Sequence, residues 1–147
     1  MWRELASEFP DADAELQDPA APDALAAIEE QLGQQLPAPL RELLTETDGI
    51  EADYGTEVIW TAEKILEENL SFRSNEQFRN LYMPFDALMF FGDNGGGDQF
   101  AFVRTPARDE IFVWDHETDS RTWIAPSLET YLRSTLASNG DDWYRTT

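Results

Sequence analysis

The chain has 147 residues and a mass of 16.8 kDa, a size typical of one domain with its own hydrophobic core. Its 30 acidic and 10 basic residues give a net charge of −20, and it has no cysteine and one histidine. The charge argues against nucleic acid and anionic membranes as partners, because both are bound through Lys and Arg. The lack of cysteine excludes disulfides and thiol chemistry, and a single histidine excludes a multi-histidine metal site.

Residues 1–21 are predicted to be an acidic lead-in to a single domain that spans residues 22–147. Trp2, Leu5 and Phe9 recur at helical spacing and predict a short helix at the start of the lead-in. Its remainder is rich in Ala, Pro and acidic residues, a composition typical of a mobile linker. The start of the chain lacks the apolar stretch of a secretion signal, and no apolar run has the ~20 residues that cross a bilayer. We therefore expect a cytoplasmic protein.

Two helices are predicted in the first third of the domain, each with one apolar stripe of Leu and Ile. The first begins at Pro22, because proline suits the first position of a helix, and it ends at Gly33. The second follows Pro39 and ends at Asp48 and Gly49. The short connection between them predicts a helical hairpin (αα-hairpin).

A strand and a third helix are predicted next. Residues 57–60 have the composition of a short strand, and Thr61 can cap a helix that spans residues 62–71. Residues 72–86 contain apolar side chains without a persistent period. For them we expect a loop with one helical turn.

The second half of the chain changes to strand patterns. Residues 87–91 are all apolar, as expected of a strand that is covered on both faces. Three further strands are predicted at residues 99–104, 110–115 and 121–124. The glycine-rich segment 92–98 and other short turns connect them, which indicates an antiparallel meander.

A last helix is expected from Pro126 to Asn139. The fold class predicted from these elements is α+β. It comprises a mainly antiparallel sheet of about 4–6 strands, packed with the N-terminal αα-hairpin, a middle helix and a C-terminal helix.

The glycine-rich segment admits three interpretations. Asp93, Asn94 and Asp98 have oxygen atoms that could bind calcium, but their spacing is not that of an EF-hand. Backbone amides of the segment could hold a phosphate, but the two aspartates would repel it. A turn that needs positive φ angles is the favoured interpretation.

No motif of a known class of active site occurs in the sequence. His116 lies in a predicted turn between two acidic residues, and this position is more typical of a solvated histidine than of a general base. We predict no catalytic residue, no cofactor and no metal site.

Acidic residues also gather in the turn that contains His116. A solvated turn is one interpretation, a metal site that includes the histidine is a second, and contact with a basic partner is a third. Trp114 and Trp123 flank this turn. We expect both to be buried in the core, and the alternative is that they act as aromatic anchors for a partner. The candidate partner-contact residues of the glycine-rich segment and this turn are Asp93, Asp98, Asp115, Glu117 and Asp119.

Four segments follow one another in the sequence: LPAPLRELL at residues 36–44, FFGDNGGGD at 90–98, IFVWDHE at 111–117 and LETYL at 128–132. In this order and spacing they resemble motifs of the SUKH superfamily, and the resemblance spans about residues 23–136. Asp48 departs from the family, in which asparagine is common at this helix end.

The resemblance implies an α+β fold without shared catalytic residues. Bacterial members of the superfamily commonly act as immunity proteins that bind and neutralise toxins, and fungal relatives act as adaptors in cell-wall assembly. The expected function is therefore a non-enzymatic immunity protein that covers a basic, nuclease-type toxin domain. An intracellular adaptor without a toxin partner is the alternative, and an enzyme or a calcium-binding module is a third class. The oligomeric state stays open.

Overall fold

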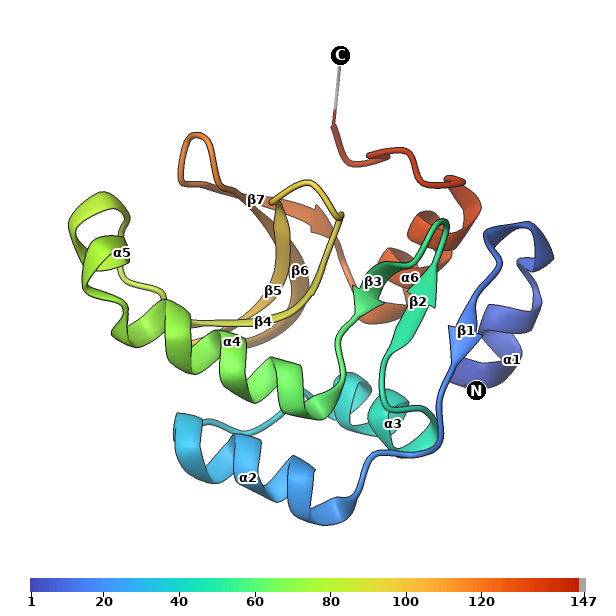
Figure 1. The fold of residues 1–147 in the computed structure, drawn as a ribbon, viewed down its shortest axis with the longest axis horizontal. Coiled ribbons are helices and arrows are strands. Elements are labelled where there is room, and N and C mark those ends of the chain that lie inside the picture. The colour runs from blue at the N-terminus through green and yellow to red at the C-terminus, as the bar shows by residue number, and fades with distance from the viewer. Residues whose placement is uncertain (146–147) are drawn as a thin grey trace.

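The computed structural model describes residues 1–145, and these residues form helices and two antiparallel sheets (Figure 1). The α+β class expected from the sequence is confirmed. In chain order the elements are α1 (Trp2–Ser7), a 3-10 turn (Pro10–Ala12), β1 (Glu15–Leu16), α2 (Pro22–Leu32), α3 (Ala38–Glu46), β2 (Ile50–Ala52), β3 (Thr56–Ile59), α4 (Ala62–Ser74), α5 (Glu76–Leu81), β4 (Leu88–Asp93), β5 (Gln99–Arg104), β6 (Ala107–Asp115), β7 (Ser120–Ala125) and α6 (Leu128–Ala137).

Helix ends follow local signals that the sequence contains. Gly33 closes α2 in the left-handed conformation, with a φ of 66°. The Thr61 hydroxyl accepts the backbone N–H of Lys64 at 3.2 Å and caps α4. Ser127 caps α6 through the N–H of Thr130, so this helix begins two residues after Pro126.

The segment that was expected to be a loop contains a second helix. Helix α4 continues to Ser74, and the Asn75 side chain then accepts the N–H groups of Gln77 and Phe78 and starts α5. Helix α5 has no fully buried residue. Phe78 of α5 packs against the core but is only partly buried, and the helix has six residues, so its apolar pattern is too short to recognise.

The second sheet has the strand order β4-β5-β6-β7, which confirms the predicted meander. The first sheet has the order β1-β2-β3, and its strands β1 and β2 were not expected. The sheets meet where the Trp60 N–H donates to the Phe91 carbonyl at 2.7 Å. A Cβ atom on Gly92 would lie 2.2 Å from the Val58 carbonyl oxygen, so glycine allows this close approach.

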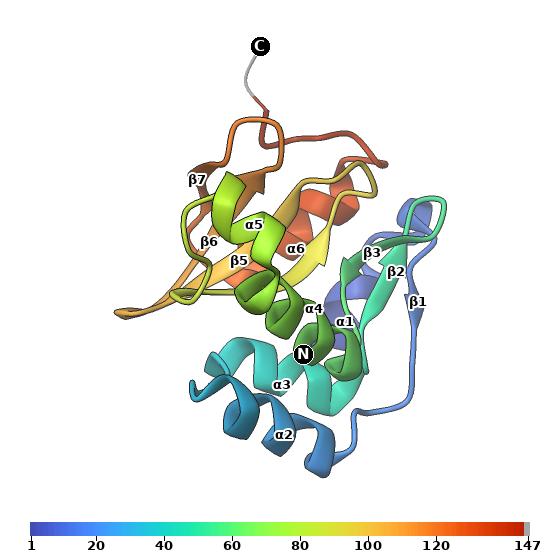
Figure 2. The same cartoon turned by 60° about the vertical axis from the view of Figure 1, so that its left-hand side comes forward.

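Aromatic side chains cover both faces of the second sheet, as predicted for strand β4. Phe90 contacts Phe72 of α4 on one face, whereas Phe91 contacts Tyr131 of α6 on the other. Successive residues of a strand point to opposite faces, so these two neighbours join two halves of one core. Figure 2 shows the sheet between α4 and α5 on one side and α6 on the other.

The N-terminal segment is packed onto the domain: residues 2–7 form the predicted short helix, and residues 11–21, whose composition is typical of a mobile linker, contain β1. The side chains of Trp2 and Leu5 are each 2% exposed, and β1 pairs with β2. The Ala20 N–H donates to the Leu44 carbonyl at 2.9 Å. Composition indicated mobility, but burial of the two large side chains of α1 stabilises the segment.

The helices of the predicted αα-hairpin follow each other in the chain, but their main partners are other helices. Helix α2 packs on α4, and α3 packs on α1. None of the helices in residues 1–145 combines the length and the apolar character that a membrane crossing requires.

Candidate partner-binding site

The turn between β2 and β3 presents a fully exposed aromatic side chain. Asp53, Tyr54 and Gly55 form this turn with φ angles of 44°, 67° and 80°, and Tyr54 has a relative exposure of 102%. The Asp53 N–H donates to the Ala12 carbonyl at 2.8 Å, and the Thr56 hydroxyl donates to the Asp53 carbonyl at 3.1 Å. These bonds fix the turn, and an ordered, exposed tyrosine is typical of residues that dominate protein interfaces.

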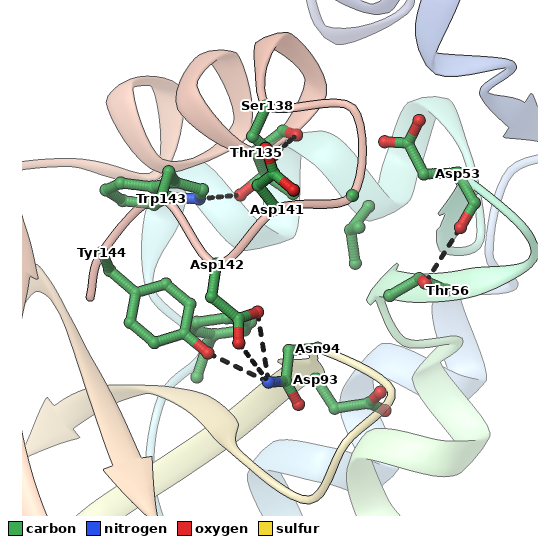
Figure 3. Close-up of a pocket in the computed structure, with 13 residues that line it drawn as sticks. Asp53, Thr56, Asp93, Asn94, Thr135, Ser138, Asp141, Asp142, Trp143 and Tyr144 are labelled. Carbon is green, nitrogen blue, oxygen red and sulfur yellow. Dashed lines mark hydrogen bonds between the residues drawn. The ribbon is translucent and has the colours of Figure 1, made fainter. Parts of the chain in front are cut away.

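A hollow lined by carboxylates lies on one face of this hairpin (Figure 3). The hairpin, the glycine-rich loop and the segment after α6 enclose it, with Phe100 in its lining. Four acidic residues from these three segments contribute to it, and no Lys, Arg or His of the described chain does. The acidic residues are Asp53, Asp93, Asp141 and Asp142.

A second hollow, of about 470 Å³, lies on the opposite face of the same hairpin. Thr56 and Val58 line the first hollow, whereas Glu57 and Ile59 line the second. Because successive side chains of a strand point to opposite faces, the two hollows lie on opposite faces of the hairpin. In residues 1–145 the lining of the second hollow also has no basic side chain. The acidic residues of the second hollow are Asp18, Asp48, Glu51 and Glu57.

Lys64 lies between the two hollows. Its Nζ is 2.8 Å from Glu57 Oε2 and 3.9 Å from Asp93 Oδ2. Burial lowers the pKa of Lys64, but the carboxylates around it outweigh burial and leave that pKa above its usual value. The cation therefore stays charged and offsets part of the negative charge here. Arg145 does the same at Asp142, because its Nε lies 3.0 Å from Asp142 Oδ2.

The charge of the hairpin turn is unfavourable for the folded protein. Burial and repulsion from Asp13 together raise the pKa of Asp53 above its usual value. The local environment of Asp53 thus opposes its charge. Such a group can be stabilised by a cation that a partner brings.

Asp93 is the predicted contact residue that lines the first hollow. Its Oδ2 accepts the Nε1–H of Trp60 at 2.7 Å, and its Oδ1 accepts the N–H of Gly95 at 2.8 Å. Both bonds orient the carboxylate at the end of β4. Figure 3 shows Asp93 and Asn94 below the C-terminal segment, with the Asn94 amide directed at Asp142 and Tyr144.

Asp98 has a structural position, because only 1% of it is exposed. Its Oδ2 accepts the Tyr144 hydroxyl at 3.1 Å and binds the Arg145 guanidinium, and its Oδ1 lies 3.1 Å from His116 Nδ1. The His116 ring covers Gly97, on which a Cβ atom would lie 2.7 Å from the ring. Asp98 therefore anchors the C-terminal segment and holds the site together from beneath its surface.

The acidic residues of the turn after β6 lie in two separate places. Asp115 joins Asp98 and His116, whose possible ligand atoms all lie within 4.8 Å of one another, and Arg145 Nη1 lies 4.0 Å from Asp115 Oδ2. The chain thus supplies its own cation at this cluster. Glu117 is exposed, and its N–H donates to Asp115 Oδ1 at 2.9 Å.

Asp119 holds two segments together. Its Oδ1 accepts Trp114 Nε1–H at 2.8 Å, and its Oδ2 accepts the Met83 N–H at 2.9 Å. Burial raises the pKa of Asp119, but these bonds and Arg121 outweigh burial and lower that pKa overall. Of the flanking tryptophans, Trp114 is in the core as predicted, whereas Trp123 is 48% exposed and differs from the prediction.

The structure thus places Asp93 in the first hollow, groups Asp98 with Asp115, and separates Asp119 from them. The sequence prediction missed Asp53, Tyr54 and the acidic pair 141–142. The Asp-Tyr-Gly run is a turn signal that could have revealed the hairpin. The position of residues 141–142 beside the hairpin depends on tertiary packing.

Residues 19–134 match the model of the SMI1 / KNR4 family (SUKH-1). No curated protein matches the chain. The matched residues include the hairpin, the glycine-rich loop and the acidic turn, and they extend over more than half of the sequence. The chain belongs to the SMI1 / KNR4 family (SUKH-1).

Proposed function

We propose that this protein is a non-enzymatic immunity protein of the cytoplasm, which binds a cognate toxin domain with a basic surface. The observation that carries the proposal is the exposed Tyr54, which lies between two hollows whose charged lining residues are all acidic. This arrangement combines an aromatic anchor with charge complementarity to lysine and arginine side chains.

The mechanism is occlusion of the toxin's active cleft. A nuclease cleft is basic because it holds phosphates, so it is a natural counterpart of an acid-lined surface. The negative field attracts the toxin and speeds the encounter, and Tyr54 then enters the contact. Carboxylates of both hollows pair with cations that otherwise hold the nucleic acid. No bond is made or broken by the immunity protein.

Binding to the purified product of the adjacent gene tests the proposal by isothermal titration. Tyr54→Ala is expected to weaken binding by tenfold or more, about 1.4 kcal/mol, because the ring is an anchor. Trp123→Ala is the matched control, since Trp123 is also an exposed aromatic residue but lies on β7. Loss of binding with Trp123→Ala alone would place the contact elsewhere and contradict the proposed site.

Co-expression distinguishes immunity from the alternative adaptor function of the cell-wall-regulator type. An immunity protein restores growth of cells that produce the adjacent gene product, and the Tyr54→Ala variant restores it less. If that product binds but is harmless to cells, the adaptor function is supported and the immunity proposal is wrong.

A further inference from the structure

A cavity of about 310 Å³ lies beside α5, in a region that the proposed toxin contact does not use. Figure 1 shows α5 at the left of the molecule, well apart from the β2–β3 hairpin. Aromatic and apolar residues line most of the cavity, together with Arg73, Arg79 and Asp86. The apolar lining residues are Phe72, Phe78, Tyr82, Met83, Pro84 and Phe85.

Large apolar side chains extend this surface into solvent. Leu81, at the end of α5, is 70% exposed, and Met83 is 58% exposed. Phe78 and Tyr82 are partly buried and contact each other with ring centroids 5.5 Å apart. Exposed apolar surface next to a cavity is typical of an interaction site.

The two arginines of the cavity have no carboxylate in ion-pair contact within residues 1–145. The Arg73 guanidinium donates to the Gln34 side chain and to the carbonyls of Leu32 and Leu88, and its buried Nε has no partner there. Burial lowers the pKa of Arg73, with Asp86 acting in the opposite direction. Arg79 is exposed and makes one long bond, of 3.4 Å, to the Arg73 carbonyl.

The cavity continues into an open depression of about 540 Å³, because Arg73, Arg79 and Asp86 line both. Leu70, which is 37% exposed, lies in this second part. The two parts form one groove, with apolar surface on each side of the arginines. We refer to it as the α5 groove.

We propose that the α5 groove binds an acidic segment of a partner protein. An apolar side chain of that segment enters the cavity beside Phe78 and Tyr82, and a neighbouring carboxylate pairs with Arg79. Charge complementarity identifies the occupant: two arginines and one carboxylate, Asp86, line the groove, and neither arginine is in ion-pair contact with a carboxylate of residues 1–145. The partner is thus opposite in charge to the toxin proposed above, so this site is independent of that function.

Two short peptides test the proposal on the full chain by NMR. The probes are N-acetyl-Asp-Phe-Asp-amide and its uncharged counterpart N-acetyl-Asn-Phe-Asn-amide. We expect saturable shifts of the backbone amides of residues 72, 78, 79, 82, 83 and 85 with both peptides. The acidic peptide should bind about fivefold more tightly, as one exposed ion pair allows.

Arg79→Gln should remove the advantage of the acidic peptide and leave the binding of the uncharged peptide unchanged. Arg108→Gln is the matched control, because Arg108 is an exposed arginine on β6 that lies outside the groove. Dispersed spectra of both variants show that they are folded. Shifts outside the groove, equal affinity for both peptides, or insensitivity to Arg79→Gln would overturn the proposal.

Discussion

Asp53 and Tyr54 are held in a conformation that costs free energy. A left-handed backbone costs about 1–2 kcal/mol for each residue other than glycine, and both residues adopt it. Asp53 also has a raised pKa, caused by burial and by Asp13. Residues at a turn that are unfavourable for stability fit a role in binding better than a role in folding.

Asp53→Asn is expected to stabilise the protein at neutral pH. The folded-state pKa of Asp53 lies above its unfolded-state value, so ionisation destabilises the fold progressively as pH rises past the unfolded pKa, and fully above the folded pKa. The gain in free energy of unfolding should therefore be largest at pH 7 and shrink as pH falls toward the unfolded pKa, about 3.9. Asparagine also tolerates positive φ, which adds a gain that is independent of pH. Chemical unfolding at several pH values measures both parts, and a gain of constant size would refute the electrostatic part.

Asp98→Ala is expected to lower stability by about 2 kcal/mol, because it removes the buried acceptor of Tyr144, Arg145 and His116. Amide hydrogen exchange in residues 141–145 should accelerate at the same time, since these residues lose their anchor. Glu117→Ala is the control, because Glu117 is an exposed acid whose side chain has no such partners among the described residues. Unchanged exchange in Asp98→Ala would show that the C-terminal segment is held by other contacts.

At the scale of elements, the junction of β3 and β4 positions both walls of the first hollow. Gly92→Ala would place a Cβ atom 2.2 Å from the Val58 carbonyl oxygen, a backbone atom that cannot turn aside. We expect a loss of about 3 kcal/mol or more in thermal unfolding, in line with overpacking against backbone. Gly96→Ala is the control, because its nearest contact would be 3.6 Å. Equal melting temperatures of the two variants would contradict the close approach.

Elements with strong local signals were predictable from the sequence. Apolar stripes and caps predicted α2, α3, α4 and α6, and the uninterrupted apolar run 87–91 predicted a strand covered on both faces. Strands β1 and β2 are two and three residues long, so their pattern is too short to recognise, and they are stabilised by pairing across 34 residues or more of chain. Helix α5 has six residues and none that is fully buried, so its pattern was also too short to recognise.

The candidate site was predictable only in part, because its residues meet through tertiary packing. Asp93 follows a recognisable strand and does line a hollow. Asp98 looks equally exposed in the sequence, but the tail brings Tyr144 and Arg145 to it from 46 and 47 residues away. Nothing local distinguishes a buried aspartate from a solvated one when its partners come from so far along the chain.

Across the whole molecule, the charged residues behind the net charge of −20 are unevenly distributed. The β2–β3 hairpin lies between two acid-lined hollows, whereas the α5 groove carries two arginines without ion-pair partners in the described chain. One chain of this size therefore offers two surfaces of different chemistry. We propose a separate partner for each surface, since α5 and the β2–β3 hairpin lie well apart in Figure 1.

The association rate with the purified toxin domain, measured by stopped flow at increasing salt, tests the central proposal most directly. We predict that the rate falls about tenfold or more between ~20 mM and ~150 mM salt, because carboxylates around Tyr54 steer the encounter. The triple variant Asp53→Asn, Asp141→Asn and Asp142→Asn should associate more slowly at low salt and depend less on salt. A rate that is the same at all salt concentrations, or that the triple variant does not change, would contradict the account.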